Sequence, residues 1–132
     1  MEAIQNYPTE ILILLFLIVT FLQSGIDKIT DWSGNLSFIK EHFSSSPLKN
    51  KVPLLLGTIL LLEMTASLFM LFGLYQLTFS GVKSAALIGV EISALTLIFL
   101  LIGQRLAKDY TGAMTLAVYF ATTILGVYLL SK

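Results

Sequence analysis

The 132-residue chain contains no cysteine, which excludes a disulfide, a thiolate metal site or an iron–sulfur cluster built from its own residues. Its single histidine, His42, likewise excludes a haem held by two imidazoles. Charged residues make up only 12% of the chain, against about 25% in ordinary soluble domains. Eight basic and eight acidic residues cancel to a formal charge of zero, so the composition gives no reason to expect nucleic acid as a partner.

Apolar residues dominate instead: they form 56% of the chain, and the mean hydropathy is +0.88. Because ordinary soluble domains contain about 45–50% apolar residues, this composition is typical of a membrane protein. Long apolar runs predict four helices, over residues 8–27, 52–79, 82–103 and 110–130. Each reaches or approaches the roughly 20 residues needed to cross a bilayer. The expected fold class is all-α: an antiparallel four-transmembrane-helix bundle, formed by a single domain over residues 1–132.

The one long connection, residues 27–51, joins the first two predicted helices. Its apolar side chains recur at helical spacing: Trp32, Leu36, Ile39 and Phe43. This pattern predicts a short amphipathic helix over residues 33–43 in the membrane interface, with Ser33 or Asn35 as its N-cap. The other two connections are short, and Asp109 is placed to cap the last helix.

Basic residues are distributed unevenly between the two sides of the predicted bundle. The first and third connections contain six of the eight: Lys28, Lys40, Lys49, Lys51, Arg105 and Lys108. Lys83 and Lys132 lie in the middle hairpin and at the C-terminus. Cytoplasmic loops carry an excess of Lys and Arg. We therefore expect the first and third connections in the cytoplasm and both termini on the periplasmic side.

Small residues form stripes along the third and fourth predicted helices. They recur every four residues: Ala85, Gly89 and Ser93 on the third helix, and Ala113, Ala117 and Ala121 on the fourth. Thr122 and Gly126 add a second stripe on the fourth helix. Small residues let helices approach closely in lipid, so we expect these two helices to pack along the stripes. The alternative is that glycine and alanine are simply common in membrane helices.

Two acidic residues, Glu63 and Glu91, lie inside the second and third apolar runs. A charged carboxyl is costly in lipid, so such residues usually face the bundle, pair with another group or stay protonated. No lysine or arginine lies deep enough to be an assured partner, although Lys28 would reach Glu63 if the long second helix extends into the cytoplasmic interface. Polar side chains of the first and last helices are the more available partners: Thr20, Gln23, Ser24, Thr115, Tyr119, Thr122 and Thr123.

Glu91 lies roughly 160–200° around its helix from Gly89 and Ser93. It therefore points away from the face assigned to the fourth helix, toward another span, a cavity or a separate protein. Three roles stay open for it: a structural hydrogen bond to a neighbour, proton transfer or ligand binding, and an intermolecular contact.

A second group of charged residues is predicted at the cytoplasmic side. It comprises Asp27, Lys28, Arg105, Lys108, Asp109 and Tyr110. Because acidic residues interrupt the basic ones, we expect a specific polar cluster; the alternative is ordinary flanking charge. Arg105 and Lys108 would bind lipid phosphates or the acidic groups of a partner. His42 is expected to be isolated and exposed, and no metal site is predicted.

Three segments resemble the DoxX family of small bacterial membrane proteins over nearly the whole chain. They are FLQSGIDKITDW (Phe21–Trp32), LLEM around Glu63, and GQRLAKDYTGA (Gly103–Ala113), of which the third is the most specific. The resemblance implies a four-helix bundle in the bacterial inner membrane. Some DoxX proteins are subunits of a thiosulfate:quinone oxidoreductase, and others associate with redox or detoxifying enzymes. The positions it implicates are Gly25, Lys28, Glu63, Arg105, Lys108, Asp109 and Tyr110.

Three functions are consistent with these features. The first is an accessory or scaffold subunit of a larger membrane assembly, with the lipid bilayer and other membrane subunits as partners. The second is a quinone-linked oxidoreductase component, in which Glu63 or Glu91 accepts a proton near a bound quinone. The third is a small transporter or proton relay, against which the lack of an inverted repeat argues. No catalytic constellation occurs in the chain itself, and no cofactor is expected beyond the quinone of the second alternative.

Overall fold

The computed structural model describes residues 5–132, which contain helices and no strand. The helices in chain order are α2 (Pro8–Thr30), α3 (Trp32–His42), α4 (Val52–Ser80), α5 (Ser84–Leu106) and α6 (Tyr110–Leu130). Helices α2, α4, α5 and α6 are each long and apolar enough to cross a membrane. The prediction of an all-helical chain with four candidate membrane spans is therefore confirmed.

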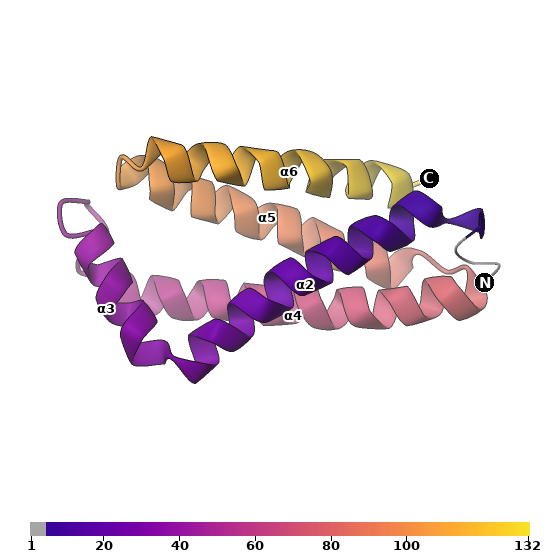
Figure 1. Cartoon of the computed structure of the whole chain (residues 1–132), viewed down its shortest axis with the longest axis horizontal. Helices are drawn as coiled ribbons and strands as arrows, with labels where there is room; N and C mark the ends of the chain where they lie inside the picture. Colours follow the sequence, from indigo (N-terminus) through magenta and orange to yellow (C-terminus); the bar gives the residue numbers. More distant parts are fainter. Residues whose placement is uncertain (1–4) are drawn as a thin grey trace.

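The four long helices form a bundle, and α3 lies at one end of it (Figure 1). Residues 81–83 join α4 to α5 at one end, and residues 107–109 join α5 to α6 at the other. We term the end with α3 and residues 107–109 the α3 end. The start of α2 and the end of α6 lie together at the opposite end, here termed the C-terminal end (Figure 1).

Local sequence signals account for where the helices begin and end. Pro8 and Pro53 lie in the first turns of α2 and α4, where a missing N–H costs no hydrogen bond. Gly81 ends α4 with a φ of 68°, a left-handed conformation that glycine adopts without strain. The Asp109 side chain accepts a hydrogen bond of 2.9 Å from the N–H of Gly112 at the start of α6, so the predicted cap is confirmed.

The observed bounds differ from the predicted ones mainly in α2 and α5. Helix α2 continues to Thr30 rather than residue 27, because polar residues past the apolar run still extend the backbone hydrogen bonds. Helix α5 begins at Ser84 rather than residue 82, after the Gly81 turn, and continues to Leu106 rather than residue 103. The polar ends of both helices thus extend the spans toward the membrane surface.

The small-residue stripe of α5 packs against α4, not against α6 as predicted. A Cβ atom added at Gly89 would lie 2.8 Å from the backbone nitrogen of Met70, and one added at Gly73 would overlap the backbone of Ala86. Ala85 and Ser93, from the same stripe, are buried. The prediction was wrong about the partner because α4 contributes a small residue of its own, which lets the two backbones meet.

Helix α6 uses its second small-residue stripe more than its first. Ala113 is buried, but Ala117 and Ala121 are exposed. The close approach is at Gly126, where an added Cβ atom would lie 2.9 Å from Ile13 of α2 and 3.2 Å from Val90 of α5. The packing prediction is therefore wrong for Ala117 and Ala121 and confirmed for Gly126, because α6 rests against α2 and α5 together.

Large apolar side chains cover much of the outside of the bundle. Leu12, Leu54 and Val118 are 66%, 70% and 65% exposed, and less than half of the most apolar window of each span is buried. Contiguous exposed apolar surface of this extent is typical of contact with lipid or with other membrane proteins.

Candidate functional site

A buried ion pair links α2 to α4 near the α3 end. The Nζ atom of Lys28 lies 2.9 Å from Oε1 of Glu63, and the two side chains are 15% and 4% exposed. The helices come close beside this pair, because a Cβ atom at Gly25 would overlap the sulfur of Met64. Lys28 therefore reaches Glu63, although the sequence favours the polar side chains of the first and last helices as the more available partners.

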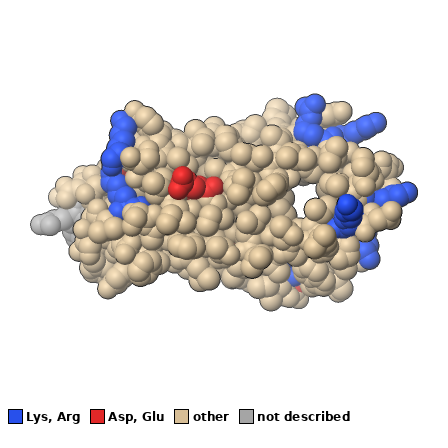
Figure 2. Space-filling model, turned by 180° about the vertical axis from the view of Figure 1, so that it is seen from behind, with Lys and Arg blue, Asp and Glu red and all other residues tan. Residues whose placement is uncertain are grey.

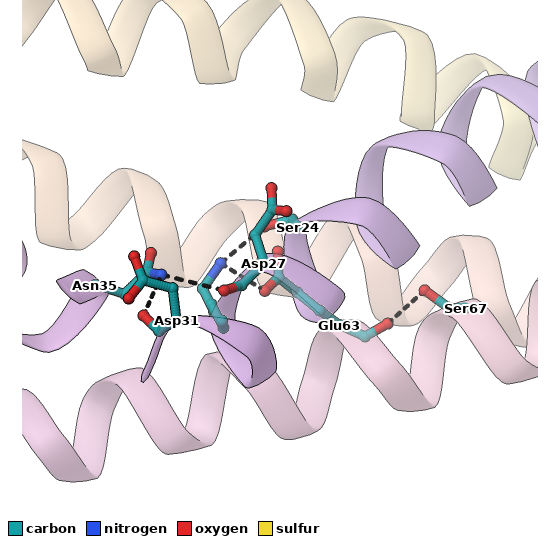
Figure 3. Close-up of polar contacts among 7 residues, drawn as sticks. Ser24, Asp27, Asp31, Asn35, Glu63 and Ser67 are labelled. Carbon is teal, nitrogen blue, oxygen red and sulfur yellow. Dashed lines mark hydrogen bonds and ion pairs between the residues drawn. The ribbon is translucent and has the colours of Figure 1, made fainter. Parts of the chain in front are cut away.

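Two hydroxyl groups lie beside this ion pair, one bound to the ammonium group and the other to the backbone only. Lys28 Nζ donates a 2.7 Å hydrogen bond to Oγ of Ser24, and Oγ of Ser67 donates a 2.7 Å hydrogen bond to the backbone carbonyl of Glu63 (Figure 3). No donor within residues 5–132 meets hydrogen-bond geometry at Oε1 of Glu63. The Lys28–Glu63 contact is therefore an ion pair by distance, and it neutralises a charge that lipid would not tolerate alone.

The corner between α2 and α3 is held by one side chain. Nδ2 of Asn35 donates hydrogen bonds to the backbone carbonyls of Asp27 at 3.3 Å and Asp31 at 2.8 Å (Figure 3). Asp31 is the N-cap of α3, without a side-chain hydrogen bond to the helix. The prediction that Ser33 or Asn35 caps α3 is wrong, because α3 begins at Trp32 and both residues lie inside it. The two carbonyls bound by Asn35 also accept hydrogen bonds from the backbone N–H groups of Asp31 and Asn35.

His42 connects α3 to the turn between α5 and α6. Its Nε2 atom lies 3.0 Å from Oε1 of Gln104 and 3.5 Å from Oδ2 of Asp109. The ring of Phe43 packs against Gly103, where an added Cβ atom would lie 3.4 Å away. Sequence reasoning missed this contact and expected an isolated, exposed histidine, because its partners lie more than sixty residues away along the chain.

The predicted polar cluster lies at the α3 end but does not form one network. Lys28 pairs with Glu63, and Asp109 caps α6 and faces His42. The guanidinium of Arg105 lies over the ring of Tyr110, 5.1 Å from its centroid. Within the described part of the chain, neither the Asp27 nor the Lys108 side chain forms an ion pair. The acidic and basic residues of this end are thus divided among separate contacts.

Glu91 is exposed on the outer face of α5. It lies seven residues after Ser84, about 10 Å along the helix at about 1.5 Å per residue. Among residues 5–132 it has neither a side-chain hydrogen bond nor an ion pair. Figure 2 shows one face of the molecule on which acidic atoms are surrounded by uncharged surface, closer to the basic side chains at one end than to those at the other. Of the three roles left open, an internal structural hydrogen bond is not formed.

Glu63 and Glu91 do not share a site. Because Gly89 packs on Met70, Glu91 is level with about residue 68 of α4, which places it about 7 Å from Glu63 along the bundle axis. Glu63 is 3% exposed and faces α2, whereas Glu91 faces outward. A mechanism that uses both carboxyls on one ligand has no support from this geometry.

Two shallow, open hollows lie on the surface. One, of about 480 Å³, lies between α5 and α6 and is lined by Leu101, Arg105, Tyr110, Ala113, Met114 and Ala117. The other, of about 310 Å³, lies on α3 and is lined by Phe38, Glu41 and His42. Neither includes Glu63 or Glu91. Over residues 5–132, no three His, Cys, Asp or Glu side chains are grouped as metal ligands.

No protein-family model, curated protein or solved structure matches this chain. The resemblance to the DoxX family therefore stays a prediction that depends on the three sequence motifs.

Proposed function

We propose that this protein is a small multi-pass membrane protein that acts as an accessory or scaffold subunit of a larger membrane assembly. The observation that carries the proposal is Glu91, an exposed acid in a span with no partner among residues 5–132. A charged side chain inside the hydrocarbon layer is costly unless another group neutralises it. A neighbouring subunit that supplies a cation or a hydrogen-bond donor removes this cost.

The proposal includes a topology. The spans are antiparallel, the α3 end faces the cytoplasm, and both termini are periplasmic. Support comes from the charge distribution, since six of the eight basic residues lie at the α3 end, in the ends of the helices, in α3 or in the connections there. The bacterial inner membrane is the location that the DoxX resemblance implies.

The ion pair of α2 and α4 supports a structural role for the protein's interior. Lys28 neutralises Glu63, and both side chains are largely buried. Glu63 is thereby accounted for without a ligand, whereas Glu91 is not. We keep the quinone-linked and proton-relay functions as alternatives with less support, because a quinone carbonyl at Glu63 would have to compete with Lys28.

The test is to extract the full chain from its native membrane with a mild detergent, through a carboxy-terminal tag, and to identify what accompanies it. We expect a membrane protein in stoichiometric amount, which is lost in E91L and reduced in E91Q. The matched control is E41Q, which changes an exposed acid of α3, outside the spans, and should retain the partner.

The other outcomes separate the alternatives. A chain that is extracted alone would overturn the accessory-subunit proposal, as would a partner that E91L retains in full. Stoichiometric quinone without a protein partner would favour the redox function. Isolation of the chain with neither would favour the proton relay.

A further inference from the structure

The groove between α5 and α6 has an apolar part and a charged end. Ala113, which is 7% exposed, and Ala117 line it and leave space there, because neither side chain extends past Cβ. Leu101 and Met114 also line it. The groove runs from Tyr110 to Ala117, about 10 Å along α6 at about 1.5 Å per residue. Its volume of about 480 Å³ is many times the roughly 30 Å³ of one water molecule.

The charged end of the groove has a guanidinium that no acid neutralises within residues 5–132. Arg105 lies in the last turn of α5, and its only specific contact there is with the ring of Tyr110. The nearest acid in the chain, Asp109, is used by the N–H of Gly112 and by His42. Lys108, three residues further along the same turn, is exposed with a φ of 61°. This end is therefore positive.

We propose that this groove binds an anionic phospholipid, with one acyl chain along Ala113 and Ala117 and the headgroup phosphate at Arg105. The guanidinium fork matches phosphate oxygens in a bidentate arrangement. Its contact with Tyr110 orients the fork at the membrane boundary, where headgroups lie. Basic pockets between membrane helices on the cytoplasmic side are suited to anionic headgroups. Lys108 adds a second positive charge beside the same headgroup.

The shape of the groove favours a lipid over the acidic residue of a protein partner. A protein acid would need only the positive end, and it would leave the apolar trough between the helices unfilled. A phospholipid fills both parts, because its headgroup phosphate lies at the positive end while its acyl chain lies along the apolar part. This site does not include Glu91, which precedes Leu101 by about 15 Å along α5 at about 1.5 Å per residue.

Native mass spectrometry of the full chain in detergent tests the proposal. Phosphatidylglycerol and phosphatidylcholine with identical acyl chains are added separately, and glycerol phosphate serves as a headgroup without a chain. We expect phosphatidylglycerol to bind more tightly than phosphatidylcholine, and glycerol phosphate not to bind. In R105Q, affinity for phosphatidylglycerol should fall about fivefold, the factor that corresponds to ~1 kcal/mol for one basic residue near an anionic surface.

Two further variants separate the contribution of the lipid acyl chain from that of the positive charge at Arg105. A117F fills the groove without changing charge, and it should weaken binding of both phospholipids. K132Q is the matched control, because Lys132 also lies over an aromatic ring, 4.2 Å from that of Tyr128, but at the C-terminal end; it should bind like the unmodified chain. Equal binding of the two phospholipids, or unchanged binding in R105Q or A117F, would overturn the proposal. Loss of a co-purified protein in R105Q with lipid binding intact would replace it by a protein contact.

Discussion

Glu63 and Glu91 are acids in consecutive apolar helices, and their surroundings are opposite. Glu63 is 3% exposed and lies 2.9 Å from a lysine of α2. Glu91 is exposed and has no ion pair among the residues that the structure describes. Lys28 thus neutralises Glu63 within the chain, whereas none of the described residues neutralises Glu91. This difference is the basis of the proposal that the face with Glu91 contacts another subunit.

The largest expected effect comes from removing Lys28. In K28M, the carboxylate of Glu63 stays buried without its cation, and breaking a buried ion pair typically costs about 3–5 kcal/mol. We expect the free energy of unfolding, measured by denaturant titration in micelles, to fall by an amount in this range. The double variant K28M/E63L should recover most of the loss, because no buried charge is then left alone.

The control for this variant is K40M. Lys40 is an exposed residue of α3 without an ion pair in the structure, and such substitutions usually change stability by less than about 0.5 kcal/mol. If K28M is no more destabilising than K40M, Lys28 does not stabilise the buried Glu63, and Glu63 does not differ from Glu91 in having an internal partner.

The second prediction tests the packing that turns Glu91 outward. Gly73 of α4 touches the backbone of Ala86, so G73A forces the two helices apart. Overpacking of this kind costs about 1–3 kcal/mol. The matched control in the same helix is G57A, where the nearest atom to the new Cβ, in Trp32, is 3.9 Å away.

The two glycine variants should therefore differ in sign. Replacing glycine by alanine where there is space stabilises by about 0.4–1 kcal/mol, so G57A should raise the midpoint of thermal unfolding slightly while G73A lowers it. Equal midpoints would mean that α4 and α5 do not pack through this contact.

A smaller effect is expected at the α3 end. H42A removes the contacts of His42 with Gln104 and Asp109, and one side-chain hydrogen bond contributes about 0.5–1.5 kcal/mol. Amide hydrogen exchange in α3 should become faster, while exchange in α5 near Gly89 is unchanged. E41A, at an exposed neighbour, is the control, and faster exchange in that variant to the same extent would contradict a specific role of His42.

The helices could be predicted from sequence because apolar run length and helical periodicity are local properties. Four runs long enough to span a bilayer, and the spacing of Trp32, Leu36 and Ile39, were sufficient for the four long helices and α3. The cap at Asp109 was also predictable, since an N-cap depends on neighbouring residues only.

The pairing of faces could not be predicted in the same way. A stripe of small residues shows which face of α5 permits close approach, but it does not show which helix packs against that face. Gly73 made α4 the partner, although α6 is also adjacent to α5 in the chain. The contact of His42 with Gln104 was missed for a related reason, because it depends on how α3 lies against the bundle.

The smallest effect on stability is expected at Glu91, and it completes the comparison of the two acids. E91L removes an exposed carboxyl that has no internal partner in the described chain, so the free energy of unfolding in micelles should change by less than about 0.5 kcal/mol. E63L is the matched variant, because it leaves Lys28 buried without its partner and should be clearly destabilising. A large loss of stability in E91L would mean that Glu91 serves the fold of the single chain. Stability that is unchanged, together with loss of the co-purified subunit, would locate the role of Glu91 between molecules.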